Sequence, residues 1–273
     1  MPRTSMRVRL RLHADQPTEA SLLLAVARRP EVLVRTEELV LTGPGGPVAV
    51  GAQTSPEGTV LHHATLPAGD VEVGYEAVVE PAEVEPGQRG GPALTVAERW
   101  EFTRPSRFCP SDRLARTAAE EFGSVPRTDL PHAVAQWVAA RTAYVSGSST
   151  PTDGALETLV DRQGVCRDFA HLTTALLRAL DVPARVAAVY APGLSPMDFH
   201  AVVEAAPRGR WEVVDATRLA PRASLVRITT GRDAADTAFL TTAGAVRLET
   251  MSVLAVVDGD LPADDHRGRA TLR

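Results

Sequence analysis

Two common residue types are missing from this chain. Its 273 residues include no lysine and no asparagine, so all 29 basic side chains are arginine. Without asparagine the chain has no N-glycosylation sequon. Without lysine it cannot form an isopeptide bond to itself. We interpret both absences as a bias of GC-rich coding, because neither points to a particular chemistry.

Cysteine, net positive charge and long apolar runs are also scarce. A disulfide between Cys109 and Cys166, the only cysteines, would not mark a secreted scaffold in a chain of this length. The formal net charge of −5 and pI near 5.8 do not support a nucleic-acid partner. No apolar run has the length of a membrane span. The stretch 20–27 follows Asp15 and Glu19, so it predicts a core strand rather than a signal peptide. We therefore expect a cytoplasmic protein with no membrane partner, and we leave its oligomeric state open.

The first 80 residues predict β structure. Short runs of alternating or continuous apolar residues are separated by Gly and Pro, a pattern typical of an antiparallel β-sandwich. The expected strands are 7–12, 21–27, 32–35, 38–41, 48–50, 60–64 and 71–80. Residues 81–96 are rich in Pro, Gly and Glu and predict a linker or long loop.

Helices are expected from Pro105 onward, followed by strands. Residues Ser111, Asp129 and Thr152 are candidate N-caps for helices ending near 122, 143 and 160. A further helix begins at Cys166, and the expected strands are 184–190, 199–205, 211–215, 225–228 and 246–257. This order predicts an α+β fold with two domains, a β-rich domain at 1–104 and a second domain at 105–273.

Cys166 is expected on the first turn of its helix. Phe169, Leu172, Leu176 and Leu180 recur at helical spacing, and the helix should end before Pro183. Unpaired N–H groups and the positive end of the dipole at a helix start favour the reactive thiolate. A cysteine alone is more often a small buried filler.

Candidate bases for this thiol are His171 and His200. His171 is on the same helix, about 140° around from Cys166, and is expected to face away from the sulfur. His200 begins a strand that a short Pro/Gly turn joins to the next strand, and antiparallel pairing would place it opposite Asp215. An imidazole beside a carboxylate is the base and orienting group that cysteine catalysis needs.

The stretch from Gly164 to His171, with His200 and Asp215 after it, resembles the transglutaminase-like (papain-type) cysteine enzyme superfamily in its bacterial branch. The resemblance implies that Cys166 is the nucleophile, His200 the general base and acid, and Asp215 the orienting group. It implies a papain/transglutaminase-like catalytic domain that needs no cofactor and no metal. Many relatives have Gln at the position of Arg167 and an aromatic residue at that of Val202. These departures leave the implied triad intact, but the resemblance does not extend to the substrate pocket.

The implied reaction is acyl transfer on an amide or peptide bond through a thioester. Hydrolysis is the leading interpretation, which makes the substrate a peptide, a protein or a small amide. The first alternative is the same triad joining an amine to the acyl group, as a transglutaminase does. The Cys166 N–H would hold part of the oxyanion, with Tyr144 or Trp137 as a candidate second donor.

Two alternatives belong to other classes. The first is a zinc site built from Cys109, Cys166, His171 or His200, although no short ligand spacing supports it. The second is a non-catalytic binding module that uses its β-rich domain. Cys109, which precedes Pro110, is interpreted as structural.

Overall fold

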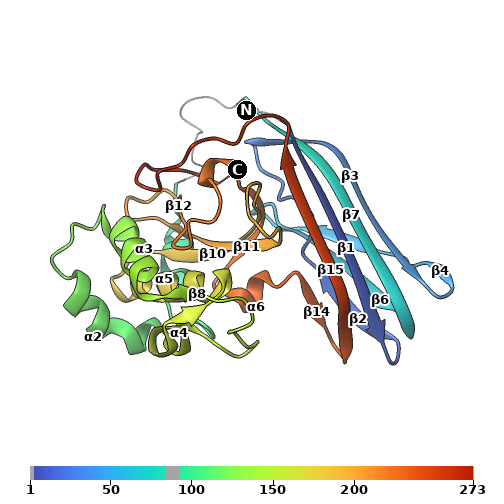
Figure 1. Ribbon diagram of the computed structural model, residues 1–273, viewed down its shortest axis with the longest axis horizontal. Coiled ribbons are helices and arrows are strands. Elements are labelled where there is room, and N and C mark those ends of the chain that lie inside the picture. The colour runs from blue at the N-terminus through green and yellow to red at the C-terminus, as the bar shows by residue number, and fades with distance from the viewer. Residues whose placement is uncertain (1–2, 84–92, 273) are drawn as a thin grey trace.

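Two regions of different secondary structure lie side by side in the molecule. One is built from long strands and the other contains the helices (Figure 1). The computed structural model describes residues 3–83 and 93–272. The mixed α and β architecture with antiparallel sheets agrees with the fold class expected from the sequence.

The β-rich region contains two antiparallel sheets. One has the strand order β15-β1-β7-β3-β4 and the other the order β14-β2-β6-β5. The strands are β1 (Thr4–Ala14), β2 (Thr18–Leu22), β3 (Val32–Gly43), β4 (Gly46–Pro47), β5 (Gly51–Thr54), β6 (Val60–Leu66), β7 (Gly69–Pro81), β14 (Leu240–Thr242) and β15 (Val246–Val257). The expected strand at 48–50 is absent: β4 ends at Pro47, and after it only one described backbone bond continues across the hairpin, from the Val48 N–H to the Leu41 carbonyl of β3 at 2.9 Å.

Both ends of the described chain contribute to these sheets. β15 pairs along the whole of β1, and β14 pairs with β2 (Figure 1). The predicted boundary at residue 104 assigns these two late strands to the second domain, whereas they pair with strands of the first. β1 shows why the sheets hold together: Val8, Leu10 and Leu12 are buried in an apolar cluster shared by both sheets, and the arginines between them are exposed.

The expected strand over 21–27 is too long at its C-terminal end. β2 ends at Leu22, and the following backbone turns toward the helical region. The N–H groups of Leu23 and Ala27 donate to the carbonyls of Phe239 and Arg227, at 3.0 and 2.9 Å. These bonds satisfy the backbone without strand pairing, so the segment joins the two regions.

The helical region surrounds one buried helix, α5. Its elements are α1 (Val96–Glu101), α2 (Ser111–Phe122), α3 (Leu130–Arg141), β8 (Ala143–Tyr144), α4 (Ala155–Asp161), β9 (Gln163–Gly164), α5 (Cys166–Ala179), β10 (Ala184–Tyr190), β11 (Phe199–Ala205), β12 (Glu212–Val214), β13 (Val226–Gly231) and α6 (Ala234–Thr237). α2, α3 and α4 pack against α5, which lies on the sheet of order β12-β11-β10-β13. None of the described helices combines the length and apolar character needed to cross a membrane.

Several helix starts differ from the expectation. Ser111 is the first residue of α2 rather than its cap. Asp129 does occupy the N-cap of α3, but its side chain makes no capping bond. Thr152 does not cap α4, because Thr150 and Asp153 close a turn there and Gly154 becomes the N-cap.

The expected loop over 81–96 contains the start of a helix that we missed. α1 begins after Thr95, which forms a capping box with Glu98. Its Thr-x-x-Glu spacing was legible in the sequence. Residues 84–92 of this loop lie outside the described residues.

Candidate active site

Cys166 is the first residue of α5 and is partly buried. Val165 before it is extended, and the Asp168 carboxylate folds back to accept the Val165 N–H at 2.8 Å. Gly164 makes room for this, because a Cβ at that position would lie 2.6 Å from the Asp168 Cβ. The Gly-Val-Cys-Arg-Asp sequence therefore builds a capped helix start that holds the cysteine in place.

Further hydrogen bonds hold the loop that contains Ser149 and Thr150 against this helix start. The Asp168 carboxylate also accepts the Ser149 hydroxyl at 2.8 Å, and Arg167 donates to the Thr150 carbonyl at 2.5 Å. Asp168 thus acts on the helix N-terminus, and among the described residues no hydrogen bond or ion pair joins it to His171. Arg167, the departure from many relatives, is tied to the neighbouring loop.

Tyr144 lies next to the cysteine because β8 pairs with β9 in parallel, with Tyr144 opposite Gly164. Its hydroxyl lies close to the Cys166 backbone N–H. Partial burial and the negative charges of Cys166, Asp198 and Asp168 raise the pKa of Tyr144 to about 12, so the hydroxyl keeps its proton at neutral pH. Trp137 is not comparable, because its indole N–H donates to Glu121 at 2.7 Å.

The structure brings His200 and Asp215 together. The His200 Nε2 lies 2.9 Å from an Asp215 carboxylate oxygen, and the two residues are 2% and 4% exposed. β11 and β12 are antiparallel as expected, but the register pairs Val203 with Val214 rather than Val202 with Val213. A shift of two residues keeps every side chain on the same sheet face, so the histidine still reaches the carboxylate.

Thr217 completes the environment of this carboxylate and was not identified from the sequence. Its N–H and hydroxyl donate to the second Asp215 oxygen at 2.8 and 2.6 Å, and the hydroxyl lies 3.4 Å from His200 Nε2. Burial opposes ionisation of Asp215, yet His200 and Thr217 together lower the pKa of Asp215.

His200 also interacts with Cys166. Burial alone would lower the pKa of the imidazole, but the Asp215 charge, the hydrogen bond to Asp215 and the nearby Cys166 side chain raise the pKa of His200 to about 10. Because Nε2 is occupied by Asp215, the sulfur is left to the other ring nitrogen. That atom, Nδ1, is buried and has no hydrogen-bond partner among the described residues, so it is available to take the thiol proton. The imidazole is therefore flanked by a carboxylate and a thiol, the arrangement that supports nucleophilic cysteine chemistry.

His171 and Cys109 lie away from this group. His171 is fully buried, stacks on Phe108, and accepts the Ala234 N–H at 3.1 Å through Nε2. Burial lowers its pKa to about 3. Cys109 is also fully buried, and burial raises the pKa of its thiol to about 12. Its surroundings agree with the structural interpretation made from the sequence.

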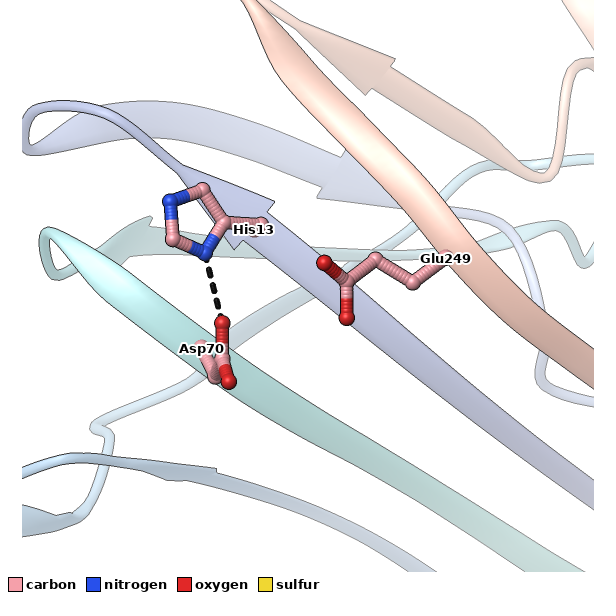
Figure 2. A group of neighbouring side chains, drawn as sticks. All are labelled: His13, Asp70 and Glu249. Atoms are coloured by element: carbon pink, nitrogen blue, oxygen red, sulfur yellow. Dashed lines mark hydrogen bonds and ion pairs between the residues drawn. The ribbon is translucent and has the colours of Figure 1, made fainter.

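The candidate zinc ligands Cys109, Cys166, His171 and His200 do not form a group of three or more ligating atoms among the described residues. Over residues 3–83 and 93–272, only His13, Asp70 and Glu249 place three metal-ligating atoms within 4.8 Å of one another (Figure 2). This cluster lies on β1, β7 and β15, outside the helical region. Arg11 already binds both of its carboxylates, at 2.9 Å from Asp70 and 3.1 Å from Glu249. A metal ion there would have to displace a guanidinium, so the cluster carries no metal assignment.

Comparisons with known proteins point to one superfamily. Residues 116–216, which include Cys166, His200 and Asp215, match the model of the transglutaminase-like superfamily. A solved structure from Cytophaga hutchinsonii, described as a candidate cysteine protease, is 31% identical with a TM-score of 0.85 and covers 97% of this chain and 95% of its own.

Two curated relatives match only in part. An uncharacterized protein of Mycobacterium bovis is 31% identical over 134 residues, which are 43% of this chain and 42% of that protein. One from Mycobacterium leprae is 28% identical over 101 residues, 36% of each chain. The matched regions thus span well under half of these relatives. The family model and the full-length likeness to the Cytophaga hutchinsonii structure together show that this chain belongs to the transglutaminase-like superfamily.

Proposed function

We propose that this protein catalyses cysteine-dependent acyl transfer on amide or peptide bonds, with water as the acceptor. The observation that carries the proposal is the position of His200, buried between Asp215 and the Cys166 side chain. Membership of a superfamily of cysteine enzymes supports cysteine-based catalysis in general. The hydrolytic outcome and the substrate, a peptide, protein or small amide, are part of the proposal.

In the first step, the Cys166 sulfur attacks the substrate carbonyl carbon while His200 holds the proton as an imidazolium. A raised pKa of about 10 keeps His200 charged at neutral pH, which stabilises a thiolate beside it. The carbon–nitrogen bond breaks as His200 gives its proton to the leaving amine, and a thioester to Cys166 remains. In the second step, His200 takes a proton from water, and the hydroxide formed displaces the sulfur.

The oxyanion of each step would be held at the start of α5. The Cys166 N–H is one donor, and the Tyr144 hydroxyl beside it is the proposed second. Tyr144 keeps its proton at neutral pH and can turn that proton toward a substrate oxygen. Asp215 and Thr217 act through His200, because they fix the ring and stabilise its charge.

Intact-mass spectrometry with an electrophilic acyl probe tests the proposal. The native protein should gain one acyl group at low probe excess, and Cys166→Ala should gain none while keeping its circular dichroism spectrum. Cys109→Ala is the matched control and should label like the native chain. Equal labelling of Cys166→Ala and the native protein would refute the assignment of Cys166 as the nucleophile.

The same acyl-enzyme distinguishes the two acceptors. Its decay is followed with and without a primary amine, and hydrolysis predicts free acid in both cases. Amide as the main product in the presence of a millimolar amine would favour the acyltransferase alternative. If the acyl-enzyme of His200→Ala decayed in water as fast as that of the native protein, the role of His200 as general base would be contradicted.

A further inference from the structure

A cavity of about 290 Å³ lies where the start of α3, β12 and the C-terminal segment meet. Asp215 lines this cavity, whereas Cys166 and His200 do not. It is therefore separate from the thiol and cannot be where the scissile bond sits in the proposed reaction.

Arginine dominates the walls. Arg208, Arg218, Arg222, Arg267 and Arg269 all line the cavity. Two of them are already neutralised within the fold. Arg208 pairs with Glu212 at 2.7 Å, and Arg222 pairs with Asp264 at 2.8 Å.

The other three arginines are exposed and form no ion pair with another described residue, although Arg267 lies near Asp265 and Arg269 near Glu212. Within the part of the chain that the structure describes, the side chains of Arg218, Arg267 and Arg269 have no hydrogen bond or ion pair. Of the wall carboxylates, Glu212 is bound by Arg208 and Asp215 by His200, which leaves Asp129. The cavity thus has a surplus of positive charge, carried by exposed arginines along its wall, and this charge attracts an anion.

The C-terminal segment that supplies two of these arginines is fastened on both sides of them. Before them, Asp264 accepts the Arg222 N–H at 2.8 Å as well as its guanidinium. After them, the Ala270 carbonyl accepts the Val213 N–H at 2.8 Å, and Leu272 is buried. Arg267 and Arg269 are therefore held at the wall rather than on a free tail.

We propose that this cavity binds a small oxyanion with two or more negative charges, carried by phosphate or carboxylate groups. Planar guanidinium groups match both kinds of oxyanion in a bidentate manner. The half-buried His132, also on the wall, offers a ring N–H. A ligand here would bridge the C-terminal segment to Arg218 beside β12, and so join the two walls.

Isothermal titration calorimetry on the full chain tests the site, with inorganic pyrophosphate and citrate as separate probes in low-salt, phosphate-free buffer. One probe at least should bind saturably at one site per chain, and the preferred probe identifies phosphate or carboxylate as the recognised group. Arg218→Gln and Arg269→Gln should each weaken that binding about tenfold, because each removes a charge-assisted contact.

Arg247→Gln is the matched control. It removes the same charge from an exposed side chain on β15, outside the cavity, and should leave binding unchanged. Circular dichroism checks that every variant is folded. The proposal is overturned if neither probe binds saturably, or if the cavity variants bind as tightly as Arg247→Gln. Labelling of Cys166 is measured separately, so the failure of this site would leave the proposed acyl transfer untouched.

Discussion

Replacing Asp215 by Asn isolates the electrostatic contribution of the buried pair. The amide keeps the size of the side chain but removes the charge that raises the pKa of His200 from its ordinary 6.5 to about 10. Burial, which lowers that pKa, would then be opposed only by the contacts with Cys166. We therefore expect the pKa of His200 to fall below 6.5, which leaves the imidazole neutral at pH 7.

The assay is the rate of Cys166 alkylation by iodoacetamide from pH 5 to pH 9, followed by peptide mass spectrometry. Loss of the imidazolium should slow alkylation at pH 6 by at least about tenfold, since the thiolate loses its partner. Thr217→Val is the graded control, because it removes one hydrogen bond to Asp215 but keeps the charge, and its profile should lie between the other two. Superimposable native and Asp215→Asn profiles would refute the reasoning.

Stability provides an independent measurement on the same pair. A raised His200 pKa stabilises the fold fully below 6.5, and this contribution disappears as pH rises through about 10. A lowered Asp215 pKa stabilises the fold above its ordinary 3.8, and this contribution disappears as pH falls. The free energy of unfolding of the native protein should therefore exceed that of Asp215→Asn most clearly between roughly pH 4 and pH 6.5. If the difference in unfolding free energy between the native protein and Asp215→Asn did not change with pH, the pKa shifts assigned to His200 and Asp215 would be contradicted.

Three further results are expected. Cys166 should alkylate far faster than Cys109 at pH 6, because Cys109 is fully buried and its pKa is raised to about 12; equal rates by peptide mapping would count against this. Tyr144→Phe should lower kcat by about tenfold with little change in KM if the hydroxyl contacts only the transition state, and an unaltered kcat would exclude it as a donor. His171→Gln should reduce the loss of unfolding free energy that the native protein shows as the pH falls below 6.5. With a folded pKa near 3, His171 stays neutral while the unfolded chain binds a proton below 6.5, so native stability should fall between these values.

The local chemistry of the helix start could be predicted from sequence because its causes are local. Apolar spacing and the breaking effect of Pro183 fixed α5, which runs from Cys166 to Ala179 as expected. The same argument placed His171 away from the sulfur. Structure was needed to show why Gly164 precedes the cysteine, because the Asp168 side chain that it accommodates folds back across the turn.

Long-range pairing was the part that sequence could not determine. Nothing in residues 246–257 indicates that this strand pairs with β1 at the other end of the chain, since alternation shows which face is buried but not which partner lies alongside. The strand expected at 21–27 failed for a related reason. Its apolar residues are buried at the contact with the helical region, so burial there does not require a strand.

The His200–Asp215 pair shows how two residues can meet even when the expected strand register is wrong. The Pro/Gly turn was expected to pair Val202 with Val213, and the strands are displaced from this by two residues. Because strand side chains repeat every two residues, an even displacement preserved the face on which His200 and Asp215 lie. It also brought Thr217 beside the imidazole, which the expected register did not do. The alternation of the strands therefore predicts which residues share a sheet face. The contact of Thr217 with the Asp215 carboxylate could not be predicted, because it depends on the register and on the loop after β12.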